Sequence, residues 1–278
     1  MVLKADSGPD LMHITGHHQA DSAAGQRLCP HGTSADTLFG GALICHQPAL
    51  GYRFSVDAVL LAHFNRPRPG WRILDLGCGC GIIALLIARR YGGCSLCGLE
   101  KQPDLAACAA SNIAANGLQA RMQLVEADLR HVQEVLAPES FDLVVCNPPY
   151  YGQGTGRINQ KEQVAQARHA LETTLQDCIR AAAFAVKNRG RVSFIFPASS
   201  QARLQEQLLA CRLVPKRLQM VYSYPAASEA RLVLVEAMKN GGVSCQVLPP
   251  FYLYDRAGGA YSAAMQSLYQ EEPCWPRS

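Results

Sequence analysis

The sequence predicts an α/β fold in which a mainly parallel sheet is flanked by helices. Short runs rich in branched aliphatic residues recur between residues 71 and 238, and segments with helical periodicity separate them. Of the 278 residues, 49% are hydrophobic, which is enough to bury a sizeable core. Strands that alternate with helices form right-handed crossovers, so most of the strands should lie parallel.

The predicted elements follow one another along the chain in a regular order. We expect strands at 71–77, 94–100, 121–128, 141–147 and 191–197, and near 217–223 and 230–238. Helices are expected at 81–92, at 103–117, after 128, from about 173 to 187, and from 201. Gly117 should end the second of these helices as a C-cap, because glycine readily adopts the left-handed conformation needed there.

The N-terminal part of the chain differs from the rest. Residues 1–34 show neither helical nor strand periodicity and are predicted to be a flexible leader. Residues 35–70 contain short strands broken by glycine and proline, followed by a helix with an apolar face, SVDAVLLAHF. We therefore expect a small N-terminal β/α cap at 35–70 and the main domain at 71–278.

Composition narrows the classes of protein and of site. No apolar stretch approaches the ~20 residues of a membrane span, and the N-terminus lacks the pattern of a signal peptide, which predicts a cytoplasmic protein. A net charge of +4 is compatible with nucleic acid but does not require it. The twelve cysteines include a CxxC at 94–97, yet a zinc site would need residues of a glycine loop and a strand. Buried free thiols are the favoured interpretation, with no metal.

A glycine loop, DLGCGCG at 75–81, follows the first predicted strand of the main domain and opens a helix. Its glycines allow a sharp turn and the close approach of a ligand to the positive end of the helix. The spacing is GxGxG and not the GxGxxG of dinucleotide sites. With Asp75 two residues before the first glycine, it resembles motif I of class I S-adenosylmethionine (AdoMet)-dependent methyltransferases.

Two more acidic residues, Glu100 and Asp128, close the next two strands. Either could be a solvated charge at a strand end. Three acids at three successive strand ends favour a nucleoside site instead, in which Glu100 accepts from the ribose hydroxyls and Asp128 meets the adenine amino group.

The fourth strand of the main domain ends in NPPY, Asn147 to Tyr150. Its prolines could simply give a rigid strand exit. Behind a cofactor loop, however, the Asn147 side-chain oxygen and the Pro148 carbonyl are suitable acceptors for the hydrogens of an amine. Tyr150 offers a face on which an unstacked base can lie. The motif then acts as a clamp for a planar substrate that carries an NH2 group.

These motifs together resemble the amino-group methyltransferases. A closer resemblance, over about 35–262, is to the bacterial valine-tRNA (adenine-N6)-methyltransferase family, which methylates adenine 37 beside the anticodon. The stretches that carry it are ADTLFGGALICHQPALGYRFSVDAVLLAHF, ILDLGCGCGIIAL, VCNPPYYGQGTGR, ARHALETTLQDCIRAAA and VLPPFYLYDRAGGAYS. The resemblance implies a class I, Rossmann-like methyltransferase with a seven-stranded sheet, AdoMet as cofactor and tRNA as partner.

The resemblance also implies roles for individual residues. Asn147, Pro148 and Tyr150 would hold the amine during catalysis. The cofactor would be bound by Asp57, Asp75, Gly77, Gly79, Gly81, Glu100 and Asp128. The loop after NPPY carries four candidate RNA contacts: Tyr151, Arg157, Lys161 and Arg168. The alternative for this loop is an ordinary solvated surface, whereas phosphate contacts would make RNA binding depend on salt.

Three other functions share parts of this pattern. Protein glutamine methyltransferases of the release-factor type also carry NPPY, but they usually have a helical N-terminal domain, unlike the Gly/Pro-broken strands here. Methylation of guanine N2 in ribosomal RNA uses related chemistry. A protein that binds AdoMet and RNA without activity is the remaining alternative. We expect the N6-adenine methyltransferase, because every residue that this chemistry needs is present.

Overall fold

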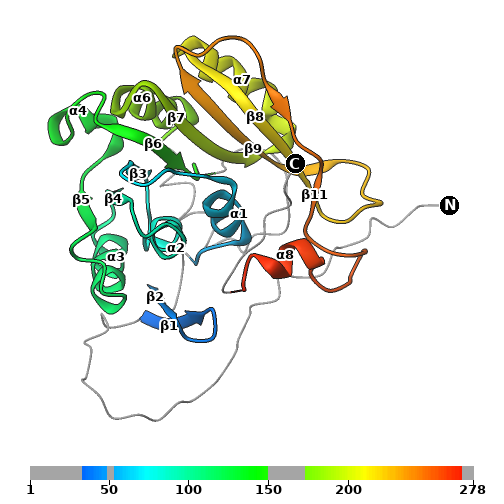
Figure 1. Ribbon diagram of the computed structural model, residues 1–278, viewed down its shortest axis with the longest axis horizontal. Coiled ribbons are helices and arrows are strands. Elements are labelled where there is room, and N and C mark those ends of the chain that lie inside the picture. The colour runs from blue at the N-terminus through cyan, green and yellow to red at the C-terminus, as the bar shows by residue number, and fades with distance from the viewer. Residues whose placement is uncertain (1–32, 49–52, 150–172, 271–278) are drawn as a thin grey trace.

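The computed structural model describes residues 33–48, 53–149 and 173–270. Within these residues the main sheet has nine strands in the order β10-β8-β9-β7-β6-β3-β4-β5, with β11 beside β8 (Figure 1). The strands are β3 (Arg72–Leu76), β4 (Ser95–Glu100), β5 (Met122–Glu126), β6 (Phe141–Cys146), β7 (Val186–Pro197), β8 (Leu213–Tyr222), β9 (Ala230–Lys239), β10 (Gln246–Val247) and β11 (Phe251–Tyr252).

The sheet is mainly parallel, as the sequence predicts. Strands β5, β4, β3, β6 and β7 are parallel neighbours, and β9 lies antiparallel between β7 and β8. The seven predicted strands are the seven longer strands, so the α/β class is confirmed. The two strands that were not predicted, β10 and β11, have two residues each and add to the outer edge of β8.

Helices connect these strands and cover both faces of the sheet (Figure 1). They are α2 (Ile82–Arg90), α3 (Pro103–Ala115), α4 (Val132–Val135), α6 (Leu175–Ala185), α7 (Gln201–Ala210) and α8 (Ala263–Ser267), with single 3-10 turns at η1 (Leu129–His131) and η2 (Ala198–Ser200). Among the described helices, none is long and apolar enough to cross a membrane.

Local sequence signals set the ends of two of these helices. Helix α3 ends as predicted, since Gly117 has φ +65° and Leu118 N donates to Ile113 O across it at 3.0 Å. Helix α6 begins after Thr174, whose hydroxyl accepts from Asp177 N while the Asp177 carboxylate accepts from Thr174 N. This capping box satisfies two backbone donors that a helix start would otherwise leave unpaired.

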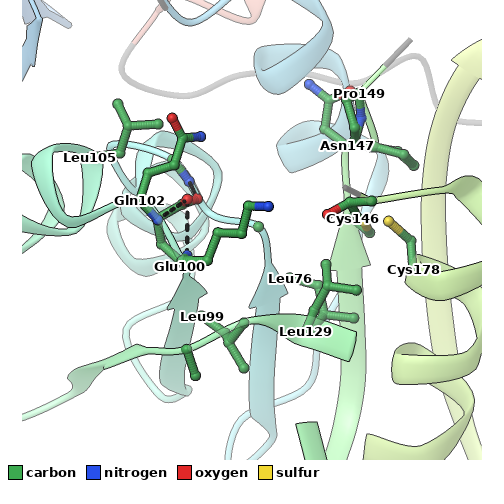
Figure 2. A pocket seen from close by; sticks show the side chains of 16 residues that line it. Leu76, Leu99, Glu100, Gln102, Leu105, Leu129, Cys146, Asn147, Pro149 and Cys178 are labelled. Carbon is green, nitrogen blue, oxygen red and sulfur yellow. Dashed lines mark hydrogen bonds between the residues drawn. The ribbon is translucent and has the colours of Figure 1, made fainter. Parts of the chain in front are cut away.

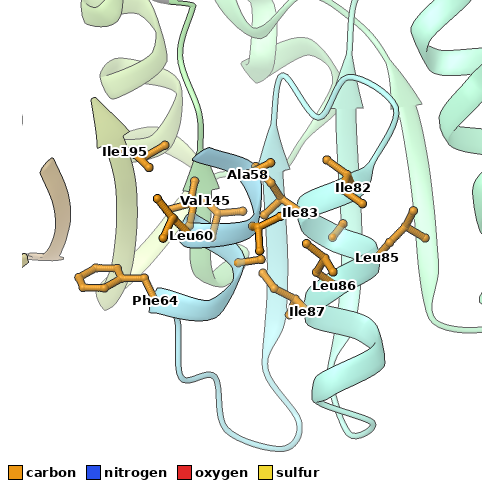
Figure 3. Packing of buried hydrophobic residues seen from close by; sticks show 14 of the residues in the cluster. Ala58, Leu60, Phe64, Ile82, Ile83, Leu85, Leu86, Ile87, Val145 and Ile195 are labelled. Carbon is orange, nitrogen blue, oxygen red and sulfur yellow. The ribbon is translucent and has the colours of Figure 1, made fainter. Parts of the chain in front are cut away.

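The N-terminal residues form a hairpin and a helix. Strands β1 (Thr33–Leu38) and β2 (Leu43–Pro48) pair antiparallel in a small sheet of their own. Helix α1 (Val56–Phe64) has eight of its nine residues buried, so it lacks the polar face expected from the sequence. It is covered because it packs on α2 and on the sheet, where Leu60 and Phe64 lie near Ile195 of β7 (Figure 3).

The predicted division into leader, cap and main domain stays a prediction. Residues 1–32 lie outside the described residues. Helix α1 shares one buried cluster with α2, β3 and β6, while a second cluster on the opposite face joins the sheet to α6 and α7. The helix of the predicted cap therefore contributes directly to the core of the sheet.

A buried histidine on α1 should make the stability of the fold depend on pH. Burial, together with the nearby Arg90 guanidinium, lowers the pKa of His63 from 6.5 to about 3. Below about 6.5 the unfolded chain binds a proton at this side chain and the folded chain does not. Stability therefore falls as the pH decreases from about 6.5 to about 3, by up to about 1.4 kcal/mol per pH unit.

Urea unfolding at a series of pH values across this range measures that slope. We expect His63→Gln to lose the histidine's share of the slope, because glutamine does not titrate. His131→Gln is the matched comparison, because it makes the same substitution at a histidine that is exposed on η1. Equal slopes for wild type and His63→Gln would contradict this account of His63.

Candidate functional site

A cavity of about 160 Å³ opens at the carboxyl ends of β3, β4 and β6 (Figure 2). In parallel sheets this edge is where ligands bind. The residues that line it come from the glycine loop, the ends of β4 and β6, and helices α3 and α6: Leu76, Gly77, Gly79, Leu99, Glu100, Lys101, Gln102, Leu105, Ala127, Leu129, Cys146, Asn147, Pro148, Pro149, Thr173 and Cys178.

The glycine loop is held against the end of β4 by backbone hydrogen bonds. Gly77 N and Cys78 N both donate to Leu99 O, at 2.8 and 3.0 Å. Gly77 and Gly79 have φ of +67° and +57°, a region that residues with a side chain rarely adopt. These two glycines line the cavity, so the ligand-facing surface of the loop there is backbone. Gly81, the N-cap of α2, lies off the cavity with φ +83°.

Glu100 ties this loop to the start of α3. Its Oε2 accepts from Gly79 N at 2.9 Å, and its Oε1 accepts from Lys101 N and Gln102 N at 3.0 and 2.9 Å (Figure 2). Only 5% of the residue is exposed. A carboxylate with this many backbone donors is fixed in place, and the residue lines the cavity.

Asp75 is buried behind the loop and does not line the cavity. Its Oδ2 accepts from Ala84 N at 3.2 Å, while its Oδ1 has no hydrogen-bond partner within the described residues. Burial raises the pKa of Asp75 to about 7, and the nearby Glu100 carboxylate acts in the same direction. The side chain therefore underlies the loop and changes charge near neutral pH.

The other side of the cavity is formed by the residues that follow β6. Asn147 is half-buried, Pro148 is buried and Pro149 is exposed. Figure 2 shows Asn147 and Pro149 across the cavity from Glu100 and Gln102. Tyr150 and the four candidate RNA contacts, Tyr151, Arg157, Lys161 and Arg168, lie outside the described residues.

Like Asp75 and Gly81, two further predicted cofactor residues lie off the wall of the cavity. Asp57 is buried in the first turn of α1. Asp128 forms an ion pair with Arg130, with 2.5 Å between Oδ2 and Nη2, and this hydrogen bond holds its pKa below the usual value. Its neighbours Ala127 and Leu129 line the cavity. The cofactor-binding roles predicted for all seven residues stay predictions: Asp57, Asp75, Gly77, Gly79, Gly81, Glu100 and Asp128.

Apolar side chains that sequence reasoning did not single out form the rest of the wall. Leu76, Leu99 and Leu129 lie between the two polar sides, and Leu105 lies beside Gln102 (Figure 2). The Cys146 and Cys178 side chains lie near each other (Figure 2), and the Cys178 thiol together with burial raises the pKa of Cys146. Cys146 is therefore a neutral thiol.

The other cysteines of the described segments agree with the sequence-based interpretation. Ten cysteines there are free, and eight of them are buried. Within the same segments no group of three His, Cys, Asp or Glu side chains is arranged to hold a metal ion. Cysteine in this chain serves mainly as a small core residue.

Similar proteins are known both by sequence and by structure. A tRNA1(Val) (adenine(37)-N6)-methyltransferase of Haemophilus influenzae is 32% identical over 153 residues, which are 55% of this chain and 64% of that protein. The protein of the same name from Shewanella amazonensis is 29% identical over 221 residues, 80% of this chain and 91% of the relative. Residues 55–189 match the family model of the methyltransferase small domain. This match covers just under half of the chain.

A solved structure agrees with the fold of this chain. The crystal structure titled as a predicted O-methyltransferase, protein Atu636 from Agrobacterium tumefaciens, superposes with a TM-score of 0.65 at 23% identity. The match covers 80% of this chain and 99% of that chain. The class I methyltransferase fold expected from the sequence is thus confirmed.

The cavity fits a nucleoside cofactor such as AdoMet. The backbone of the glycine loop and the Glu100 carboxylate supply hydrogen-bonding groups on one side of the cavity. Leu99, Leu105 and Leu129 supply an apolar surface on which a flat ring can lie. A mostly apolar pocket with a few fixed polar groups is typical of small-molecule sites. Gly77, Gly79 and Glu100 would hold such a cofactor, and Asn147 and Pro148 line the same cavity.

Gly98 of β4 lies outside the glycine loop, but we expect the position of the loop to depend on it. A Cβ on Gly98 of β4 would lie 2.8 Å from Cys78 Sγ and 3.4 Å from Leu124 Cδ1. We expect Gly98→Ala to lower the free energy of unfolding by about 1–3 kcal/mol, because the thiol and the loop that carries it must move.

A double-mutant cycle by chemical unfolding tests this contact. Cys78→Ala removes the sulfur that the new Cβ of Gly98→Ala would contact. The double variant should therefore lose less free energy of unfolding than the two single variants lose in sum. Simple additivity would contradict the proposed contact between β4 and the loop.

Proposed function

We propose that the protein is an AdoMet-dependent methyltransferase that acts on the N6 amine of adenine in RNA, with adenine 37 of valine tRNA as its substrate. One observation carries the proposal: a single cavity has the glycine loop and Glu100 on one side and Asn147-Pro148 on the other. Cofactor and acceptor groups are therefore within reach of each other. An activity on tRNA places the enzyme in the cytoplasm.

On the cofactor side, the chain supplies binding and orientation. The cofactor itself brings a methyl group that is activated on a sulfonium. Glu100 accepts hydrogen bonds from ribose hydroxyls, and it keeps Gly79 in place while doing so. Leu99, Leu105 and Leu129 exclude water from the ring that they cover.

On the substrate side, Asn147 and Pro148 orient the amine. The lone pair of an adenine amine is delocalised into the ring, so the nitrogen is a poor nucleophile. Asn147 Oδ1 and the Pro148 carbonyl accept hydrogen bonds from the two N–H groups of the amine. This favours a pyramidal nitrogen with its lone pair toward the methyl group. Positive charge would develop on that nitrogen as its new N–C bond forms and the methyl–sulfur bond breaks. The two fixed acceptors would stabilise that charge until one hydrogen of the amine is released to solvent as a proton.

The choice of RNA rests on similarity. The Haemophilus and Shewanella relatives are named as methylating adenine 37 of tRNA1(Val) at N6. The alignment spans 64% of the Haemophilus protein, and it reaches 91% of the Shewanella protein. Residues 150–172 lie in the sequence between Pro149 and Thr173, which both line the cavity, and they include the four candidate RNA contacts: Tyr151, Arg157, Lys161 and Arg168.

Transfer of labelled methyl from AdoMet tests the class of substrate. The chain is incubated with total tRNA from cells that lack it, with ribosomal RNA, or with release factors, and the product is treated with ribonuclease or protease. We expect label in tRNA that ribonuclease releases. Label in ribosomal RNA would favour the guanine-N2 alternative, and label released by protease would favour glutamine methylation. Tight binding of AdoMet without transfer to any of these would favour the inactive RNA-binding alternative.

A further inference from the structure

One edge of strand β2 faces away from β1, and within the described residues its backbone is hydrogen-bonded by side chains and not by another strand. Its inner edge pairs with β1. Backbone groups of alternate residues in a strand point to opposite edges, and unpaired ones need partners. For Ile44 and His46 the partners are two asparagines of α3, which lies beside the hairpin (Figure 1).

The two asparagines bind β2 in the same way. Asn116 Oδ1 accepts from Ile44 N at 3.0 Å, and its Nδ2 donates to Ile44 O at 2.7 Å. Asn112 Oδ1 accepts from His46 N at 2.6 Å, and its Nδ2 donates to His46 O at 2.9 Å. Because they are four residues apart, they lie on one face of the helix and mimic a neighbouring strand.

Only Asn112 makes a further bond to the glycine loop. Its Nδ2 also donates to Cys80 O at 2.9 Å, and the side chain is fully buried. Gly77, Cys78 and Gly79 are held by Leu99 and Glu100 of β4, so the Asn112 bond holds the end of the loop next to α2. The Cys45 and Cys80 sulfurs, 3.8 Å apart, bring β2 and the loop together at the same place.

We propose that Asn112 is a positioning residue for the cofactor loop and couples its geometry to the β1–β2 hairpin. This inference rests on the proposed function, because it takes the loop to bind AdoMet. One planar amide satisfies β2 and Cys80 together, so a shift of the strand moves the amide that holds the loop. By linkage, if the docked hairpin strengthens cofactor binding, a bound cofactor must stabilise the docked hairpin by the same free energy.

Calorimetric titration with S-adenosylhomocysteine separates this role from plain structural support. We expect Asn112→Ala to raise the Kd by about 10-fold, as loss of one buried hydrogen bond predicts. Asn116→Ala is the matched control, because it also releases β2 but has no bond to the loop; its Kd should stay within about 2-fold of wild type. A similar loss in the free energy of unfolding for Asn112→Ala and Asn116→Ala shows that the two variants are comparable in structural damage.

Hydrogen exchange in the wild-type chain gives a second readout that needs no variant. S-adenosylhomocysteine should slow the exchange of amides in residues 43–48, and this protection should persist in Asn116→Ala and vanish in Asn112→Ala. The inference is overturned if ligand leaves these amides unchanged in wild type, or if both variants bind ligand equally well. A wild-type chain that binds no ligand at all would instead refute the proposed function on which the inference rests.

Discussion

Replacing Asn147 with alanine is expected to lower the turnover of methyl transfer by ~100-fold or more, the loss seen when a fixed hydrogen-bonding group at a reacting centre is removed. The Asn147 oxygen is one of two acceptors that orient the amine. The other, the backbone carbonyl of the buried Pro148, remains in the Asn147→Ala variant. Because Asn147 lies across the cavity from Glu100, the affinity for AdoMet should change little.

Single-turnover kinetics with saturating cofactor measures this effect, and calorimetry reports cofactor affinity in the same preparation. Asn188→Ala is a matched control: the same substitution at an exposed residue of β7, which contacts Asn240 and lies away from the cavity. Its turnover should equal that of wild type. An Asn147→Ala variant with nearly normal turnover would remove this residue from the mechanism.

Replacing Glu100 with alanine is expected to raise the Kd for AdoMet by ~100-fold or more. The change removes a carboxylate that accepts from Gly79, Lys101 and Gln102. Those bonds are lost from the free and the bound protein alike, so the change in Kd comes from the acceptor proposed for the two ribose hydroxyls. Hydrogen bonds to a charged group contribute about 1.5–3 kcal/mol each, and the loss of two accounts for this factor.

The neighbouring strand supplies the control for this experiment. Glu126 ends β5 in register with Glu100 and is exposed. Glu126→Ala should bind AdoMet like wild type in the same calorimetric titration. If Glu100→Ala binds the cofactor within a few-fold of Glu126→Ala, the assignment of Glu100 to the cofactor is wrong.

Much of the fold can be predicted from the sequence because its signals are local. The seven longer strands are apolar runs, Gly117 ends α3 as expected, and the glycine loop follows β3. The antiparallel position of β9 was not predicted. It depends on the pairing of β8 and β9 through the short connection at 223–229, which has no helix to return the chain in parallel.

The site could be predicted only where the motif itself reaches the cavity. Gly77, Gly79, Glu100, Asn147 and Pro148 line it. Cys178 reaches it from α6, far along the chain, and such a contact depends on how the helix packs. The buried Asn112 was missed too, although two asparagines four residues apart in the alanine-rich helix α3 are a signal that could have been used. A buried amide implies backbone groups that need it.

The most direct test of the central claim is nucleoside mass spectrometry of tRNA after reaction with methyl-labelled AdoMet. The tRNA comes from cells that lack the enzyme, and wild type is compared with Asn147→Ala. The proposed clamp predicts labelled N6-methyladenosine with wild type and its loss with the variant. Labelled N2-methylguanosine would contradict adenine as the base, and N6-methyladenosine formed equally well by Asn147→Ala would contradict the clamp itself.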